Sequence, residues 1–139
     1  MSGTLKKIML VEDDPDIQLV ARLSLEVGGG YAVRVCGSGA EAVLTARADP
    51  PDLILLDMMM PGMDGLATMD ALRKLPETAA TPMVFFTANS QENVKRHLLR
   101  RGALGVIVKP FEPKALVEQI DALWQRYASG APAFQPPTG

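Results

Sequence analysis

Apolar residues along the chain form two alternating kinds of pattern. Short and nearly unbroken apolar runs are typical of strands buried in a parallel sheet, and they lie at 8–11, 31–36, 53–56, 83–86 and 106–108. The run at 53–56 is apolar on both faces, which predicts a central strand. The run at 31–36 alternates apolar and polar residues, which favours a strand near a sheet edge.

Between and after these runs, apolar residues recur three or four positions apart, which predicts amphipathic helices. The first predicted helix carries Ile17, Val20, Ala21, Ser24 and Leu25 on one face. Five helices are predicted. The first is capped by Asp13 or Asp14 and ends at the glycines at 28–30, and the second is capped by Ser38 and ends at 49–51. The third starts at about Asp64, the fourth covers 90–101, and the fifth carries apolar residues from Leu116 to Tyr127.

This alternation of strands and helices predicts an α/β fold. Its five-stranded parallel sheet would carry helices on both faces, joined by right-handed crossovers. In such sheets a ligand site lies beyond the carboxyl ends of the strands. Residues 129–139 hold prolines and glycines without apolar periodicity, so we predict one domain over 1–128 and a disordered C-terminal tail over 129–139.

Composition narrows the class of protein. The 139 residues are 47% hydrophobic and 22% charged, which fits one globular domain with a sizeable core. The net charge of -2 argues against broad binding to nucleic acid or to an anionic membrane. One cysteine and one histidine exclude an internal disulfide and any multi-cysteine metal site. Without a signal-like or membrane-spanning apolar stretch, a cytoplasmic protein is expected.

Polar residues follow four of the predicted strands directly. Glu12 and Asp13 come after the first, Asp57 after the third, Thr87 after the fourth and Lys109 after the fifth. Because parallel strands end at the same edge of the sheet, these side chains are expected to converge. Clustered carboxylates repel one another unless a cation lies among them, and their hard oxygens suit Mg²⁺.

Such a cluster points to phosphoryl chemistry. The Asp57 carboxylate could attack phosphorus and form an aspartyl phosphate. Lys109 would neutralise phosphate oxygens and Thr87 would donate a hydrogen bond to them. The alternative is an ion pair between Lys109 and Asp57 at the strand ends without chemistry, which leaves the additional acidic residues unexplained.

Four segments resemble the receiver domain of two-component response regulators, in that family's order and spacing. The segments are 8–15 (IMLVEDDP), 53–65 (LILLDMMMPGMDG), 86–88 (FTA) and 108–111 (VKPF), and the resemblance covers about residues 5–128. It implies a flavodoxin-like sheet with strand order 2-1-3-4-5. It also implies a cytoplasmic, stand-alone regulator that is not an enzyme, takes a phosphoryl group from a sensor histidine kinase or phosphotransfer protein, and signals by phosphorylation-dependent contact.

The resemblance also implies a role for each matching residue. These are Asp57 as phosphoacceptor; Glu12, Asp13, Asp57 and the backbone carbonyl of Met59 as Mg²⁺ ligands; Thr87 as the switch hydroxyl; and Lys109 as the phosphate-binding lysine. Pro110 matches a position that usually follows a cis peptide bond. Val106 departs from the family pattern, which has Tyr or Phe there, so a relay from the threonine to an aromatic ring is in doubt.

Partners follow from the same resemblance. The predicted helix over 90–101 is basic, and with the fifth strand and last helix it matches the family's usual output face for a downstream protein target. The simpler interpretation is a solvated helix face, and neither nucleic acid nor membrane is expected as a partner.

Other functions remain as alternatives. A phosphorelay intermediate or a receiver scaffold without output would carry the same residues. An aspartyl-nucleophile phosphatase would have a second Asp where Met59 stands. A flavodoxin-like cofactor binder would need a phosphate-binding loop in place of the acidic residues after the first strand.

Overall fold

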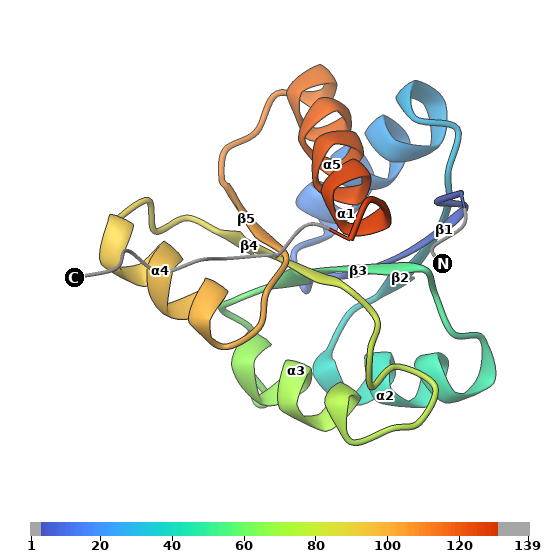
Figure 1. Ribbon diagram of the computed structural model, residues 1–139, viewed down its shortest axis with the longest axis vertical. Coiled ribbons are helices and arrows are strands. Elements are labelled where there is room, and N and C mark those ends of the chain that lie inside the picture. The colour runs from blue at the N-terminus through green and yellow to red at the C-terminus, as the bar shows by residue number, and fades with distance from the viewer. Residues whose placement is uncertain (1–3, 131–139) are drawn as a thin grey trace.

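The computed structural model describes residues 4–130, and Figure 1 shows a single sheet flanked by helices. The five strands are parallel and lie in the order β2-β1-β3-β4-β5. Their bounds are β1 Lys7–Val11, β2 Ala32–Cys36, β3 Leu53–Asp57, β4 Met83–Thr87 and β5 Gly105–Val108. This confirms the predicted α/β class, the strand order and the edge position of the alternating strand.

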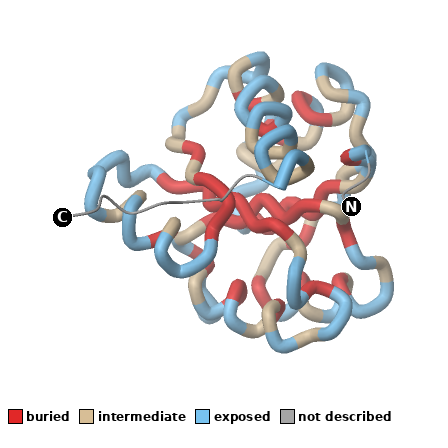
Figure 2. The backbone as a smooth tube through the Cα atoms, viewed as in Figure 1, coloured by how far each residue is buried: buried red, intermediate tan, exposed pale blue. Residues whose placement is uncertain are grey.

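Helices cover both faces of the sheet. The helices are α1 Pro15–Leu23, α2 Gly39–Ala48, α3 Gly65–Arg73, α4 Glu92–Arg100 and α5 Pro113–Ala128. Figure 1 places α1 and α5 on one side of the sheet and α2 and α3 on the other. Figure 2 shows that many of the buried residues lie along the strands between these layers.

Alternation along each strand divides the core into two layers. On β4, Phe85 packs in the layer beneath α2, α3 and α4, whereas Phe86 packs in the layer beneath α1 and α5. Both rings are fully buried. Two adjacent and equally buried phenylalanines therefore point to opposite faces of the sheet.

Polar caps begin three of the helices where the sequence predicted them. Asp14 accepts hydrogen bonds from the backbone N–H groups of Asp16 and Ile17 at the start of α1. Ser38 and Asp64 cap α2 and α3 in the same way. These side chains satisfy amide groups that have no partner within the helix.

The first helix differs from its prediction in two respects. After Leu23 it continues as one π-helical segment, Ser24–Gly28. Within this segment the Ser24 hydroxyl donates to the Val20 carbonyl at 2.6 Å, a bond that competes with regular helix pairing. Val20 was expected on the buried face but is 43% exposed, because it faces the groove between α1 and α5 rather than the sheet.

The fourth helix is shorter than the predicted 90–101. It begins at Glu92, because the Asn89 side chain accepts a hydrogen bond from the Gln91 N–H and holds the preceding residues in a loop. The expected tail at 129–139 lies outside the described residues, apart from Ser129 and Gly130 in the turn after α5. Among the described helices, none combines the length and apolarity of a transmembrane span.

Gly65, the first residue of α3, lies against the chain at the end of β3. A Cβ atom there would come within 2.7 Å of the Met58 Cα and would also clash with the Asp57 carbonyl oxygen. We expect Gly65→Ala to lower the free energy of unfolding by about 1–3 kcal/mol, measured by urea denaturation. Gly37→Ala, whose Cβ would meet only side-chain atoms at 3.6 Å or more, should change it by less than about 0.5 kcal/mol. Equal effects of the two substitutions would contradict this account of Gly65.

Candidate functional site

The carboxyl ends of β1, β3 and β5 bring the predicted acidic residues and the lysine together. Strand β3 lies between β1 and β4, with Val11 beside Leu56 and Asp57 beside Phe86. Glu12 and Asp13 therefore follow β1 next to Asp57, which ends β3. Lys109 follows β5 and reaches the same place with its side chain.

Lys109 bridges two buried carboxylates. Its Nζ lies 2.7 Å from Glu12 Oε1 and 3.0 Å from Asp57 Oδ1. Glu12 is 1% exposed and Asp57 is 3% exposed. Burial by itself disfavours the ammonium form, but hydrogen bonds to Glu12 and Asp57 outweigh it and raise the pKa of Lys109. The lysine is thus a fixed positive charge in this site.

Burial shifts the pKa of Glu12 in the opposite direction from that of Lys109, because it disfavours the charged form of each. It raises the pKa of Glu12 to about 7, and the nearby Asp57 carboxylate contributes to the increase. The hydrogen bonds from Lys109 and from the Asp14 N–H favour the ionised form but compensate only in part. Three carboxylates and one ammonium group leave an excess of negative charge in this site.

A divalent cation would relieve that excess. Carboxylate oxygens of Glu12, Asp13 and Asp57 all lie within 4.8 Å of one another, and Asp13 is exposed to solvent. Three hard oxygen donors with one side open suit Mg²⁺, which retains several water molecules when bound. The donor set thus fits the ion that the sequence predicted.

Two further predicted residues, Thr87 and Met59, lie near this cluster, the first buried and the second exposed. Thr87 is buried at the end of β4, and its hydroxyl accepts a hydrogen bond from the Asn89 N–H at 3.0 Å. The Met59 N–H donates to Asp57 Oδ1 at 3.3 Å, while the Met59 residue as a whole is 74% exposed. The predicted cis peptide bond is present between Lys109 and Pro110.

Sequence reasoning missed an aromatic contact of the lysine. The Lys109 Nζ lies 5.1 Å from the centre of the Phe86 ring, which packs against Phe111. Phe86 was predicted as a strand residue and as the first residue of the motif 86–88, without a contact to the lysine. Its neighbour across the ladder is Ile107, two residues before Lys109, so knowledge of the register would have placed Phe86 and Lys109 on one face.

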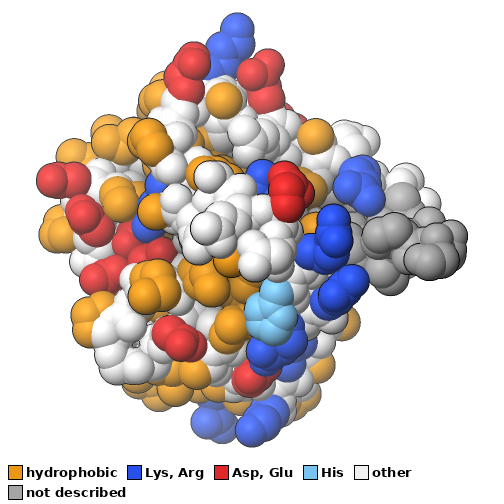
Figure 3. Space-filling model, turned by 90° about the vertical axis from the view of Figure 1, so that its left-hand side faces the viewer, with side chains coloured by type: hydrophobic (Ala, Val, Ile, Leu, Met, Phe, Trp, Pro, Cys, Tyr) orange, Lys and Arg blue, Asp and Glu red, His pale blue; other side chains and the backbone are white. Residues whose placement is uncertain are grey.

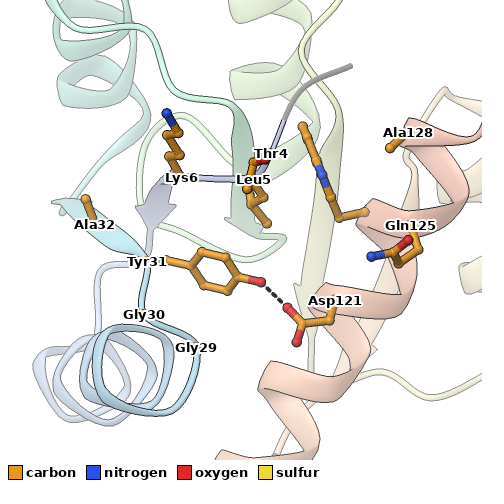
Figure 4. Close-up of a pocket in the computed structure, with 11 residues that line it drawn as sticks. Thr4, Leu5, Lys6, Gly29, Gly30, Tyr31, Ala32, Asp121, Gln125 and Ala128 are labelled. Carbon is orange, nitrogen blue, oxygen red and sulfur yellow. Dashed lines mark hydrogen bonds between the residues drawn. The ribbon is translucent and has the colours of Figure 1, made fainter. Parts of the chain in front are cut away.

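One hollow of the surface adjoins this site and another lies away from it. A groove of about 330 Å³ beside Lys109 is lined by Ile17, Val20 and Phe111 among others, and most of its lining is apolar. A larger pocket of about 730 Å³ lies at the opposite edge of the sheet, between the beginnings of β1 and β2 and helix α5. Figure 4 shows Tyr31 in this pocket donating a hydrogen bond to Asp121. This pocket is remote from the carboxylate cluster.

Charge is unevenly distributed over the face shown in Figure 3. Acidic side chains gather on one part of this face, and Lys and Arg side chains gather on another. Helix α4 and the residue after it supply exposed basic groups, namely Arg96, His97, Arg100 and Arg101. Arg101 forms an ion pair with Asp70 at 2.8 Å, so part of this charge is already compensated.

The fold and site together define a class of protein. It is a doubly wound α/β domain that carries, at the carboxyl edge of its sheet, a lysine and a cluster of carboxylates suited to binding a cation. The model of the response regulator receiver domain matches residues 8–121 of this chain. The chain therefore belongs to the response regulator receiver domain family of two-component systems. Domains of this family generally act in signalling rather than as enzymes.

Individual relatives agree with this assignment. The chain is 34% identical over 122 residues to the phosphate regulon transcriptional regulatory protein PhoB of Rhizobium meliloti, covering 88% of this chain and 53% of that protein. It is 36% identical over 121 residues to the DNA-binding response regulator MtrA of Mycolicibacterium smegmatis, covering 87% and 51%. The chain thus spans about half the length of these curated relatives.

Solved structures show the same fold. The chemotaxis response regulator CheY4 of Vibrio cholerae is similar with a TM-score of 0.79 at 29% identity, covering 86% of this chain and 99% of that chain. A response regulator from Chloroflexus aurantiacus gives 0.79 at 31% identity, covering 88% and 100%.

The raised pKa of Glu12 makes stability depend on pH. The folded protein retains a proton on Glu12 up to about pH 7, whereas the unfolded chain releases it near 4.5. The contribution of this carboxyl to the free energy of unfolding therefore falls as pH rises between these values. We expect Glu12→Gln to remove that decrease in buffer free of divalent ions, measured by urea denaturation between about pH 5 and pH 8. Parallel pH profiles of variant and wild type would contradict this prediction.

Proposed function

We propose that this domain is a Mg²⁺-dependent phosphoacceptor switch in which Asp57 carries the phosphoryl group. The observation that supports this most directly is the buried Asp57 carboxylate, hydrogen-bonded to Lys109 and adjacent to Glu12 and Asp13. An ion pair without chemistry would need only one of these acids. The additional acidic residues have a role when a cation and a phosphoryl group share the site.

The reaction forms one bond and breaks one. Lys109 and the Met59 N–H both donate to Asp57 Oδ1, so we assign the other carboxylate oxygen, Oδ2, as the nucleophile. Oδ2 forms a bond to the phosphorus of a phosphohistidine on the donor protein. The bond from that phosphorus to the histidine nitrogen breaks, and the nitrogen keeps the electron pair. Lys109 then contacts a phosphoryl oxygen, and the Thr87 hydroxyl rotates to donate to another.

Four groups would hold Mg²⁺ in this site: the carboxylates of Glu12, Asp13 and Asp57 and the backbone carbonyl of Met59. When bound, the ion neutralises charge on the carboxylates and on the phosphoryl oxygens. Glu12 is fixed by Lys109 and by the Asp14 N–H, and Asp13 is the more exposed of the acidic pair. We therefore assign Asp13 as a direct ligand.

The phosphodonor is proposed to be a histidine of a sensor kinase or of a phosphotransfer protein. The apolar groove beside Lys109 offers a docking surface next to the nucleophile. Val20, which is 43% exposed although it belongs to an apolar helix pattern, lines this groove as well as the one between α1 and α5. A partner helix with apolar side chains would cover such a surface.

Output is proposed to pass through the loop after Thr87. That hydroxyl now accepts from the Asn89 N–H, and Asn89 in turn accepts from the Gln91 N–H just before α4. A new bond from Thr87 to the phosphoryl group would change this chain of contacts and shift the population of α4 positions. The exposed basic groups of α4 would then favour contact with an acidic protein partner, with β5 and α5 completing that face.

Phosphoryl transfer can be tested directly. We expect incubation with Mg²⁺ and a small phosphodonor such as phosphoramidate to add one phosphoryl group per chain, seen by intact mass. Asp57→Asn should abolish the adduct, because an amide is a poor nucleophile. Asp64→Asn is the matched control: it changes an exposed carboxylate that caps α3, and Asn also caps helices. An adduct that persists in Asp57→Asn would refute the proposal, and steady release of phosphate over many turnovers would favour a phosphatase.

Metal binding can be tested on two neighbouring acids. We expect Asp13→Asn to weaken Mg²⁺ affinity at least about tenfold by calorimetric titration, because a charged ligand becomes neutral. Asp14→Asn should leave the affinity within about twofold, because Asp14 caps α1 and Asn retains that role. Similar losses in both variants would mean that only overall charge matters and would overturn the assignment of Asp13 as a ligand.

A further inference from the structure

The ammonium group of Lys109 lies over one aromatic ring, that of Phe86, which packs against a second ring, that of Phe111. The Nζ atom lies 5.1 Å from the centre of the Phe86 ring, within the range of a cation–π contact. The Phe86 ring is fully buried and its centre lies 5.0 Å from that of Phe111, at an interplanar angle of 43°. The lysine therefore has three partners: two carboxylates and one ring face.

The ring differs from the carboxylates because its charge distribution does not change during the reaction. Before transfer, Lys109 lies between Glu12 and Asp57. Transfer converts the Asp57 carboxylate into an acyl phosphate, so the negative charge nearest to Lys109 increases and moves. A lysine side chain has a flexible four-carbon stem. With charged partners alone, its ammonium group would follow the negative charge as that charge moves. The contact between Nζ and the Phe86 ring can be kept while the charged partners change.

We propose that Phe86, supported by Phe111, is a positioning residue that keeps the Lys109 ammonium directed toward Asp57 during phosphoryl transfer. This inference rests on the proposed phosphoacceptor function. Phe86 does not touch the phosphoryl group; it acts through Lys109. The expected consequence of its loss is slower transfer rather than loss of the nucleophile.

The alternative role for Phe86 is to fill the core, and the adjacent residue distinguishes the two. Phe85 is as fully buried as Phe86 and lies on the same strand, but it packs in the opposite layer of the core with Ile54 and Leu56. Replacing either ring by Leu removes a comparable volume from a well-packed core. Only the replacement of Phe86 removes a contact with Lys109.

The experiment compares Phe86→Leu with Phe85→Leu at saturating Mg²⁺. We expect the rate of phosphorylation by phosphoramidate, followed by intact mass, to fall about three- to thirtyfold in Phe86→Leu. In Phe85→Leu it should stay within about twofold of the wild-type rate. Urea denaturation of each variant would establish that the two have lost comparable stability.

Nuclear magnetic resonance supplies a second measurement that does not depend on phosphorylation. The Phe86 ring current should shift the ε-methylene protons of Lys109 upfield in the wild type and in Phe85→Leu. That shift should disappear in Phe86→Leu. Phe111→Leu, which alters a half-buried ring, is the milder variant if Phe86→Leu does not fold, and it should give a smaller change in the same direction for both measurements.

Two results would overturn the inference. One is equal phosphorylation rates in Phe86→Leu and Phe85→Leu; the other is a Lys109 shift that is unchanged when Phe86 is replaced. A wild-type protein that takes up no phosphoryl group would instead refute the proposed function, and the role of Phe86 in transfer would fall with it. The two failures are therefore distinguishable.

Discussion

The arrangement of this site depends on one buried ammonium group shared by two carboxylates from different strands. Lys109 lies 2.7 Å from Glu12 and 3.0 Å from Asp57, and both acids are almost completely buried. Buried carboxylates without a partner are costly, and removing one member of such a pair commonly costs about 3–5 kcal/mol. The lysine thus links the ends of β1, β3 and β5 and allows Asp57 to lie at the boundary of the core.

The same interaction leaves the site incompletely neutralised. Glu12, Asp13 and Asp57 carry more negative charge than one lysine can compensate, and the pKa of Glu12 rises to about 7 as a result of burial and the adjacent Asp57. This imbalance favours a divalent cation, and it supports the proposed use of the site. A fully compensated ion pair would be stable but would provide neither a metal site nor a nucleophile.

Apolar side chains lie beside this charged centre, some of them buried in the core and some exposed at a groove. The Phe86 ring supports Lys109 from within the core, and Phe111 continues that contact to the groove where Val20 is exposed. On the opposite side, Thr87 and Asn89 connect the end of β4 to the loop before α4. Val106, which replaces the usual aromatic residue, is half-buried and packs against the core. Rotation of an aromatic ring at position 106 is therefore not available, and the proposed relay to α4 uses the loop after Thr87.

By itself the sequence determined the order of strands and helices, the cap at Ser38, the helix starts near Asp14 and Asp64, and the set of polar residues at the strand ends, because these depend on local periodicity and turn chemistry. The structure decided between Asp13 and Asp14 and showed that Asp64 is a cap. The family resemblance added the strand order. Only the tertiary structure decided which groups meet: that Lys109 bridges Glu12 and Asp57 and rests on Phe86, that Val20 faces a groove, and that α1 ends in a π-helical segment. Such contacts depend on register and packing between segments far apart in the chain, and the pattern of apolar positions within one segment does not encode them.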